Sequence, residues 1–182
     1  MAAAKANPES IKFGSPGFGA TQHMAAELFK QNAGVNMLHV PYRTSPEALA
    51  SLLSKNIDVL FDTVTALQGQ VQSGQVSALA VTGKDRFSAV PNVPTVSESG
   101  VVPNYDVTTW YGLYGPKGMP PAVIAKLNKA LNEILQEPET RDRLGKTGVI
   151  VKSSTPEAWH QFMVAEYKKW TDVRVKSGLE QR

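Results

Sequence analysis

The hydrophobic positions of the first hundred residues follow two spacings. In residues 21–33 the apolar side chains recur one helical turn apart, which predicts a helix that ends at Gly34. A second helix is predicted to begin at Ser45-Pro46, because proline is favoured in the first helical turn, and a third covers residues 66–73. Short apolar runs predict four strands, which lie before Gly14 and at residues 35–41, 57–61 and 76–82. This alternation predicts a largely parallel sheet with helices on both faces.

The pattern changes in the second half of the chain. Residues 91–104 contain three prolines and are predicted to be irregular, whereas residues 105–114 alternate like a strand. Helical spacing of apolar residues follows Pro121, and a shorter helix follows Pro138. A strand is expected at 149–151, and a last helix with a capping box of Ser154 and Glu157 is expected to bury four side chains, Trp159, Phe162, Met163 and Trp170. We therefore predict two domains, an α/β ligand-binding lobe at 10–104 and a strand-and-helix part at 105–182.

Composition and charge remove several classes of function. The 182 residues include 42% hydrophobic residues and carry a net charge of +3, with the basic residues scattered rather than gathered in a stripe. We therefore expect no nucleic-acid partner. No run of 18 apolar residues predicts a spanning helix, and the first ten residues lack the apolar stretch of a signal peptide. The absence of cysteine excludes disulfides and thiolate chemistry.

Familiar catalytic motifs are incomplete in this chain. The spacing from Gly14 to Thr21 is close to that of a phosphate-binding loop, but Ala20 stands where the lysine is needed. The histidines lack metal-ligand spacing, and His39 is expected to be packed within a strand. A triad of Ser15, His23 and Asp62 can be drawn, although Ser15 lacks the context of a nucleophile elbow. We predict no catalytic residue, metal or cofactor; a hydrolase acting through Ser15 or Asp62 and a protein-interaction module are the alternatives.

Three polar loops follow three consecutive predicted strands. The first contains Gly14, Gly17 and Gly19 and leads into a helix whose amino terminus attracts anions, where Thr21 adds a hydroxyl. The second contains Arg43, which suits a carboxylate, and the third contains Asp62. Ligands of open parallel sheets bind beyond the carboxyl ends of the strands, so these loops are a candidate site. The alternative is that Thr21 and Ser45 cap helices and that Arg43 lies in solvent.

The chain also resembles the Bug-type extracytoplasmic solute receptors of tripartite tricarboxylate transporters. The matching segments occur in family order between residues 11 and about 178; they are GSPGFGATQH, HVPYR, IDVLFD, QVSALAVTGKDR, PNVPTVSESG and WYGLYGPKGMP. The resemblance implies a periplasmic-binding-protein-like fold of type II, whose two lobes close on a small organic carboxylate. It also implies a periplasmic location and a membrane permease as partner. The predicted ligand-binding residues are Ser15, Gly17, Phe18, Gly19, Ala20, Thr21, Tyr42, Arg43 and Asp62.

The chain departs from this family in two loop positions and in length. Thr44 stands where family members usually have glycine, and Ala20 precedes Thr21 where they have a glycine. Members begin with a signal peptide and the first half of lobe one, whereas this chain begins where lobe two begins. We therefore expect an N-terminally truncated receptor with one complete parallel-sheet lobe and the C-terminal part of the other. Its uncovered apolar helices are expected to dock on a second copy, as a homo-oligomer or exchanged dimer.

Overall fold

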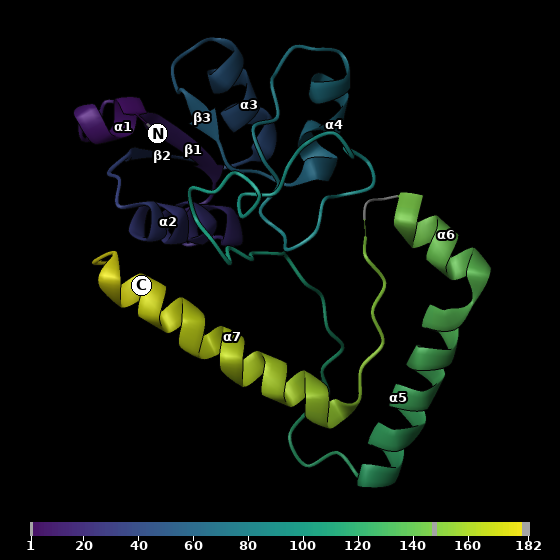
Figure 1. Cartoon of the computed structure of the whole chain (residues 1–182). Coiled ribbons are helices and arrows are strands. Elements are labelled where there is room, and N and C mark those ends of the chain that lie inside the picture. Colours follow the sequence, from purple (N-terminus) through teal and green to yellow (C-terminus); the bar gives the residue numbers. More distant parts are fainter. Residues whose placement is uncertain (1, 147–148, 180–182) are drawn as a thin grey trace. The chain divides into compact units, whose positions relative to one another are not determined.

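The computed structural model describes residues 2–146 and 149–179, which form two compact units (Figure 1). The first unit comprises residues 1–109 and 172–182, and the second comprises residues 110–171. Tyr105 and Val107 are buried in the first unit. The predicted domains at 10–104 and 105–182 are lobes of a whole receptor, and this division of the chain stays a prediction.

A three-stranded parallel sheet organises the first unit. Its strands are β1 (Lys12–Pro16), β2 (Leu38–Tyr42) and β3 (Val59–Leu60), in the order β2-β1-β3. In the register of the central strand, Phe13 lies opposite His39 on one side and Val59 on the other. Because β1 has neighbours on both sides, its residues 13–15 are all buried.

Helices cover both faces of this sheet. Helix α2 (Thr21–Ala33) lies on one face, and α3 (Ser45–Leu53) and α4 (Val64–Gln72) lie on the other (Figure 1). The connection from β1 to β2 and the connection from β2 to β3 run in opposite directions along the sheet. Because both crossovers are right-handed, their helices α2 and α3 must lie on opposite faces. The predicted bounds of α2 are confirmed, and its end at Gly34 has the left-handed conformation that glycine adopts readily.

The core of the first unit forms around Phe13. It includes Ala26 of α2, Met37 and Ala4 of the short helix α1 (Ala2–Ala6). Five partly buried hydrophobic residues pack against it, namely Ile11, Phe29, Val35, Val59 and Phe61. The buried Tyr105 hydroxyl donates to the Ala25 carbonyl at 2.6 Å, and burial raises the pKa of Tyr105. An irregular segment thus completes a core that the sheet begins.

Three predicted strands are wrong. Residues 76–82 form a single parallel bridge, in which Val81 pairs with Thr95. Prolines in the facing segment, including Pro94, cannot donate to a ladder, so the pairing stops there. Residues 105–114 and 149–151 are not strands either. The alternation at Tyr105 and Val107 reflects alternating burial without a partner strand, because both are nearly inaccessible while residues 106 and 108 are exposed.

The second unit consists of helices and connecting segments. Helices α5 (Pro121–Gln136) and α6 (Pro138–Lys146) follow each other, and α7 (Pro156–Lys176) begins in this unit and ends in the first. The predicted cap Ser154 is wrong, because the Thr155 hydroxyl accepts from the Ala158 amide at 3.1 Å. Within the described ranges no helix is both long and apolar enough to cross a membrane.

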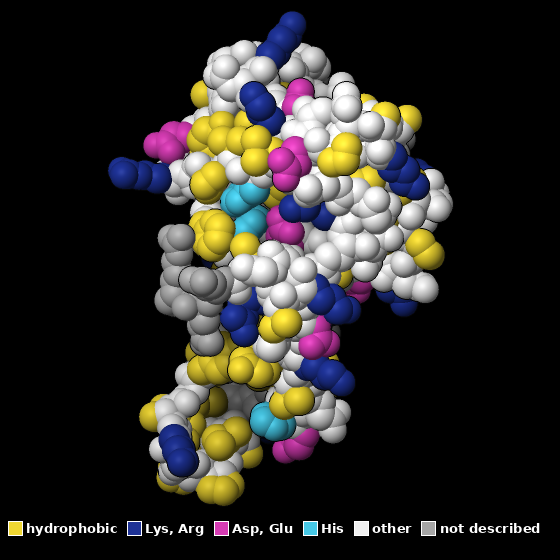
Figure 2. Space-filling model, turned by 90° about the vertical axis from the view of Figure 1, so that its left-hand side faces the viewer, with side chains coloured by type: hydrophobic (Ala, Val, Ile, Leu, Met, Phe, Trp, Pro, Cys, Tyr) yellow, Lys and Arg dark blue, Asp and Glu magenta, His cyan; other side chains and the backbone are white. Residues whose placement is uncertain are grey.

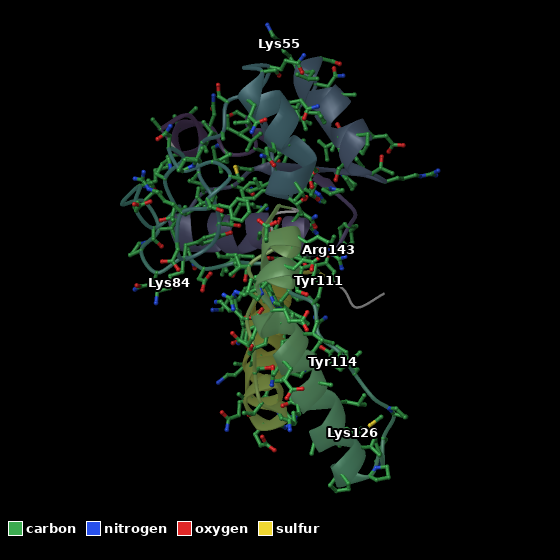
Figure 3. All side chains as sticks on the ribbon, turned by 90° about the vertical axis from the view of Figure 1, so that its right-hand side faces the viewer. Lys55, Lys84, Tyr111, Tyr114, Lys126 and Arg143 are labelled. Carbon is green, nitrogen blue, oxygen red and sulfur yellow. The ribbon has the colours of Figure 1, made fainter. Side chains whose placement is uncertain are left out.

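Apolar side chains of the second unit are poorly covered. Trp110, Trp159 and Phe162 form an aromatic cluster with ring centroids 5.4 to 5.5 Å apart, yet Phe162 is 38% exposed. The expectation of burial is therefore wrong for Phe162, and Trp159, Met163 and Trp170 are only partly buried. Tyr111 and Tyr114, labelled in Figure 3, are 85% and 60% exposed. The space-filling view shows several hydrophobic side chains at the surface (Figure 2).

Candidate functional site

The three polar loops lie at one edge of the sheet. The loops after β1, β2 and β3 begin at residues 17, 43 and 61, and parallel strands place their carboxyl ends together. The register pairs Pro16 with Tyr42 and Gly14 with Leu60. The strand order changes direction at β1, and ligands of doubly wound sheets bind in the crevice at such a switch point. The topology therefore brings together the loops that the sequence predicted.

Two glycines give the first loop its shape. Gly17 and Gly19 have positive φ angles of 107° and 75°, and a Cβ on Gly19 would meet nothing within 4 Å. The Gly17 amide donates to the Ser15 carbonyl at 3.1 Å, and the Gly19 amide donates to Nδ1 of His23 at 3.0 Å. Both glycine amides are therefore already engaged within the chain.

The amides of this loop region that have no partner within the helix come from the start of α2. Ala20 occupies the cap position without a side-chain hydrogen bond, and the Met24 amide donates to its carbonyl at 3.0 Å. The amides of Thr21 and Gln22 come before this first intrahelical hydrogen bond, so they have no acceptor within the helix. They lie at the positive end of the helix dipole. The reading of Thr21 as a cap is wrong. The start of α2 thus retains the electrostatic character of an anion site.

Gly14 has a packing role in β1. A Cβ at this position would lie 2.5 Å from Cδ1 of Ile57 and 3.2 Å from the Tyr42 ring. Ile57 is 2% exposed, so it has little room to move. The absence of a side chain at Gly14 therefore lets the neighbouring segments pack closely, and Gly14 does not belong to the loop itself.

The catalytic triad that can be drawn from the sequence does not form. The buried Ser15 hydroxyl lies 2.8 Å from Nε2 of His39 and 3.3 Å from the Gly17 carbonyl. His23 faces Gly19 and Glu27, and Asp62 accepts hydrogen bonds from the Ser45 hydroxyl and the Thr63 amide. Ser15 therefore stabilises the glycine turn through its contact with the Gly17 carbonyl. The expectation that His39 is packed within a strand is confirmed, since it stacks on Phe13 at 4.7 Å.

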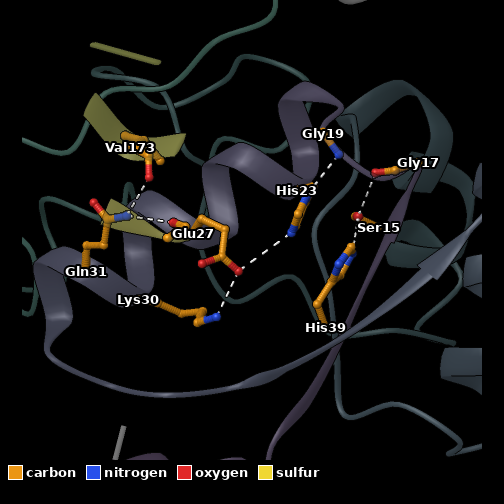
Figure 4. A network of polar contacts seen from close by, with 10 residues as sticks. Ser15, Gly17, Gly19, His23, Glu27, Lys30, Gln31, His39 and Val173 are labelled. Carbon is orange, nitrogen blue, oxygen red and sulfur yellow. Dashed lines mark hydrogen bonds and ion pairs between the residues drawn. The ribbon is translucent and has the colours of Figure 1, made fainter. Parts of the chain in front are cut away.

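A chain of polar contacts extends from the glycine loop along α2 (Figure 4). Nε2 of His23 lies 3.6 Å from a carboxylate oxygen of Glu27, which Lys30 approaches to 2.8 Å. Burial raises the pKa of Glu27, but hydrogen bonds from His23 and Lys30 outweigh it and lower the pKa to about 2. Burial and then the neighbouring His23 lower the pKa of His39 to about 4. At neutral pH Glu27 is therefore charged and His39 is neutral.

The second and third loops are joined by Asp62. Its Oδ1 accepts from the Ser45 hydroxyl at 3.0 Å and from the Thr63 amide at 2.7 Å. Its Oδ2 is buried and has no hydrogen-bond partner among the described residues. Thr44, not Ser45, caps α3 by accepting from the Glu47 amide at 3.4 Å. Asp62 therefore has one buried oxygen that no donor among the described residues satisfies at this edge.

The remaining predicted site residues differ in accessibility. Arg43 is exposed, and its amide donates to the Glu47 carboxylate at 3.1 Å. The Tyr42 hydroxyl is engaged with the Ser51 hydroxyl, so it is not free for a ligand. Phe18 is 47% exposed and lies 4.9 Å from the His23 ring. Within residues 2–146 and 149–179, no group of three or more His, Asp or Glu side chains could hold a metal ion.

Sequence reasoning missed the polar chain behind the loop. The i, i+4 spacing of His23 and Glu27, with Lys30 three residues further, places all three on one helical face and was a usable signal. The pairing of His39 with Ser15 had no such signal, because it depends on the register between β1 and β2. The sequence suggests Ser45 only as a helix cap. Its contact with Asp62 could not be predicted either, because it depends on how the loops after β2 and β3 lie in the fold.

Comparison with known proteins identifies relatives across the whole chain. Residues 1–179 match the model of the tripartite tricarboxylate transporter family receptors. A protein from the tcbD-tcbE intergenic region of Pseudomonas sp. is 34% identical over 179 residues, which are 98% of this chain and 53% of that relative. BugT of Bordetella pertussis is 29% identical over 180 residues, 99% of this chain and 55% of BugT.

The chain spans about half the length of these curated relatives, but a relative of similar length is also known. A protein from the clcB-clcD intergenic region of Pseudomonas knackmussii is 35% identical over 163 residues, which are 90% of this chain and 96% of that relative.

Solved structures give the same result for the fold. A protein of R. palustris solved with adipate has a TM-score of 0.79 at 27% identity, covering 97% of this chain and 59% of that one. MatC from Rhodopseudomonas palustris with bound malate has a TM-score of 0.73 at 26% identity, covering 94% and 59%. The periplasmic binding protein BugD has a TM-score of 0.73 at 30% identity, covering 100% and 61%.

These similarities confirm the predicted fold class, a mixed α/β periplasmic-binding-protein-like fold with a parallel sheet. The matched family and the solved neighbours are substrate-binding receptors, which supports a binding function over hydrolysis through Ser15 or Asp62.

Proposed function

The chain belongs to the family of tripartite tricarboxylate transporter receptors, and on that basis we propose that its three loops form one side of a binding site for a small organic carboxylate. The observation that carries the proposal is the start of α2, where the Thr21 and Gln22 amides lie beyond the carboxyl end of the central strand. Solved relatives named with adipate and malate support a dicarboxylate as the ligand class.

Each loop has a distinct role in this proposal. Gly17, Phe18, Gly19 and Ala20 shape the approach to the helix start, and the Thr21 amide and hydroxyl donate to one carboxylate group. Ser15 supports the turn from below through its contact with the Gly17 carbonyl. Arg43 is exposed and attracts the anion. The unpaired oxygen of Asp62 accepts from a ligand hydroxyl or from a water that the ligand orders.

Isothermal titration of the chain with adipate and malate tests this proposal. We expect saturable binding in which Gly19→Val lowers the affinity at least about tenfold, because the side chain obstructs the approach to the amides and strains a backbone of positive φ. Gly34→Val is the matched control, since Gly34 also has positive φ and open space but lies at the other end of α2. Equal affinities of both variants and the parent would contradict the location of the site.

The variant Thr21→Ala tests whether the ligand contacts the Thr21 hydroxyl or only the backbone amides at the start of α2. Because Ala20 occupies the cap position, we expect the melting temperature of the ligand-free chain to stay within about 1 °C of the parent. A two- to tenfold loss of affinity would assign the hydroxyl to the ligand. Unchanged affinity would leave recognition to the amides.

We also propose the location and partners that go with this activity. A receptor of this class works in the periplasm, and it delivers its ligand to a membrane permease. Exposed apolar positions on α5, among them Ile124, Leu127 and Ile134, support self-association of the chain through this helix.

Light scattering across a concentration series tests self-association. We expect Leu127→Glu to weaken it by about tenfold or more, because burying a leucine contributes about 1.5–3 kcal/mol. Leu79→Glu in the first unit is the control, since Leu79 is 72% exposed and lies outside α5. A monomeric chain at every concentration would exclude the proposed oligomer.

A further inference from the structure

His23 connects the glycine loop to the interior of the first unit. Its ring is 1% exposed, and Nδ1 accepts the amide hydrogen of Gly19 at 3.0 Å (Figure 4). Gly19 lies just outside the helix, before the cap position at Ala20, whereas His23 completes the first helical turn. The side chain therefore ties a residue of the loop to the helix whose free amides are the candidate anion donors.

The ring of His23 is held on several sides. It stacks on His39 with centroids 3.8 Å apart and an angle of 10° between the planes, and Phe18 lies 4.9 Å away. Its second nitrogen, Nε2, lies 3.6 Å from the Glu27 carboxylate. Because one nitrogen binds the loop and the other faces a carboxylate, the ring cannot turn without losing both contacts.

These contacts define where the ring carries its proton. A nitrogen that accepts from an amide has a free lone pair, so Nδ1 is unprotonated and Nε2 carries the hydrogen that faces Glu27. A side chain without an acceptor at the position of Nδ1 would leave the Gly19 amide without this partner.

The charged and titratable groups next to His23 and next to its partner Glu27 come from four elements. Glu27 and Lys30 lie on α2 and His39 lies on β2. Lys5 of α1 and Lys176 of α7 line a hollow of about 570 Å³ together with Glu27 and Lys30. The β1 residues nearest to the histidines, Phe13 and Ser15, are uncharged.

We propose that His23 is a positioning residue for the carboxylate site: its ring holds Gly19 and thereby keeps the loop in the shape that leaves the Thr21 and Gln22 amides open to an anion. This inference rests on the proposed function. It adds that ligand affinity falls when the acceptor at Nδ1 is removed, because the loop then loses its tether. A purely structural cap would change stability and leave the affinity of the folded chain unaltered.

The test uses adipate and malate as probes, with affinities measured at pH 7.5. His23→Asn keeps an acceptor near the position of Nδ1, and we expect this variant to bind within threefold of the parent. His23→Phe keeps a ring but no acceptor, and should bind at least tenfold more weakly than the parent. His160→Asn, at an exposed histidine of α7, should bind as the parent does.

The amide of Gly19 provides a readout that needs no ligand. Its ¹H–¹⁵N signal should keep the parental position in His160→Asn, stay near it in His23→Asn, and shift in His23→Phe, which lacks the acceptor. A Gly19 signal that is unchanged in His23→Phe, or parental affinity in that variant, would overturn the positioning role. If neither probe binds while the Gly19 signal behaves as described, the proposed function fails and the tether itself stands.

Discussion

The two compact units differ in how they treat their apolar residues. The first has a sheet, and Phe13, at 0% exposure, lies at the centre of a core that both sheet faces and an irregular segment complete. The second has regular helices, of which α5 has a clear apolar stripe, yet none of its hydrophobic side chains among the described residues is fully buried. Helical periodicity therefore predicts which face is apolar, and it does not establish that the face is covered.

The largest contrast should come from removing one apolar side chain in each unit. Phe13→Ala should lower the free energy of unfolding by about 3–5 kcal/mol, because it leaves a cavity in a packed core. Leu127→Ala should cost less than about 1 kcal/mol, because Leu127 is already 45% exposed. Urea denaturation followed by circular dichroism measures both, and similar losses would mean that the second unit has a core of comparable quality.

A buried carboxylate in the first unit, Glu27, and an exposed one in the second, Glu133, should differ in how they affect the pH dependence of stability. The pKa of Glu27 is lowered from 4.5 to about 2, so its contribution is complete above pH 4.5 and is lost as the pH falls toward 2. At pH 7 Glu27→Gln should cost up to about 3 kcal/mol, and the difference from the parent should shrink with acidification. Glu133→Gln should change stability by less than about 0.5 kcal/mol, since its pair with Lys129 is 3.9 Å apart and exposed.

Parallel denaturation series at pH 7, 4 and 3 make this comparison. If Glu27→Gln and the parent lose stability in parallel as the pH falls, the contacts with His23 and Lys30 do not stabilise the charged form.

The smallest expected contrast concerns two glycines in close contact with neighbours. Gly14→Ala should cost about 1–3 kcal/mol, because the added Cβ meets Ile57 and the Tyr42 ring within a packed sheet. Gly112→Ala would meet the Trp159 indole, but that side chain is only partly buried and can shift, so we expect less than about 1 kcal/mol. Thermal unfolding of both variants measures the difference, and the reverse order would show that Trp159 is held more firmly than the core around β1.

Much of the fold could be predicted because it depends on local signals. The bounds of α2 followed from apolar spacing and from Gly34, and the start of α5 followed from Pro121. The predicted strand at 76–82 failed because a strand requires a partner, and its apolar run carries no information about whether one is available. The same limit applies to residues 105–114, whose alternation records burial against an irregular core.

By itself, the sequence determined helices α2 to α7, the parallel direction of the first three strands and the position of three polar loops at their carboxyl ends. These features follow from periodicity, helix-terminating residues and the handedness of crossovers, which are local or topological. The tertiary structure decided which groups in those loops are free. Ser15 and His39 are separated by 24 positions, and only the register of β1 against β2 brings them into contact. The Gly19 amide turned out to be bound by His23 because that ring is packed between His39 and Phe18, a constraint that no spacing along the chain expresses.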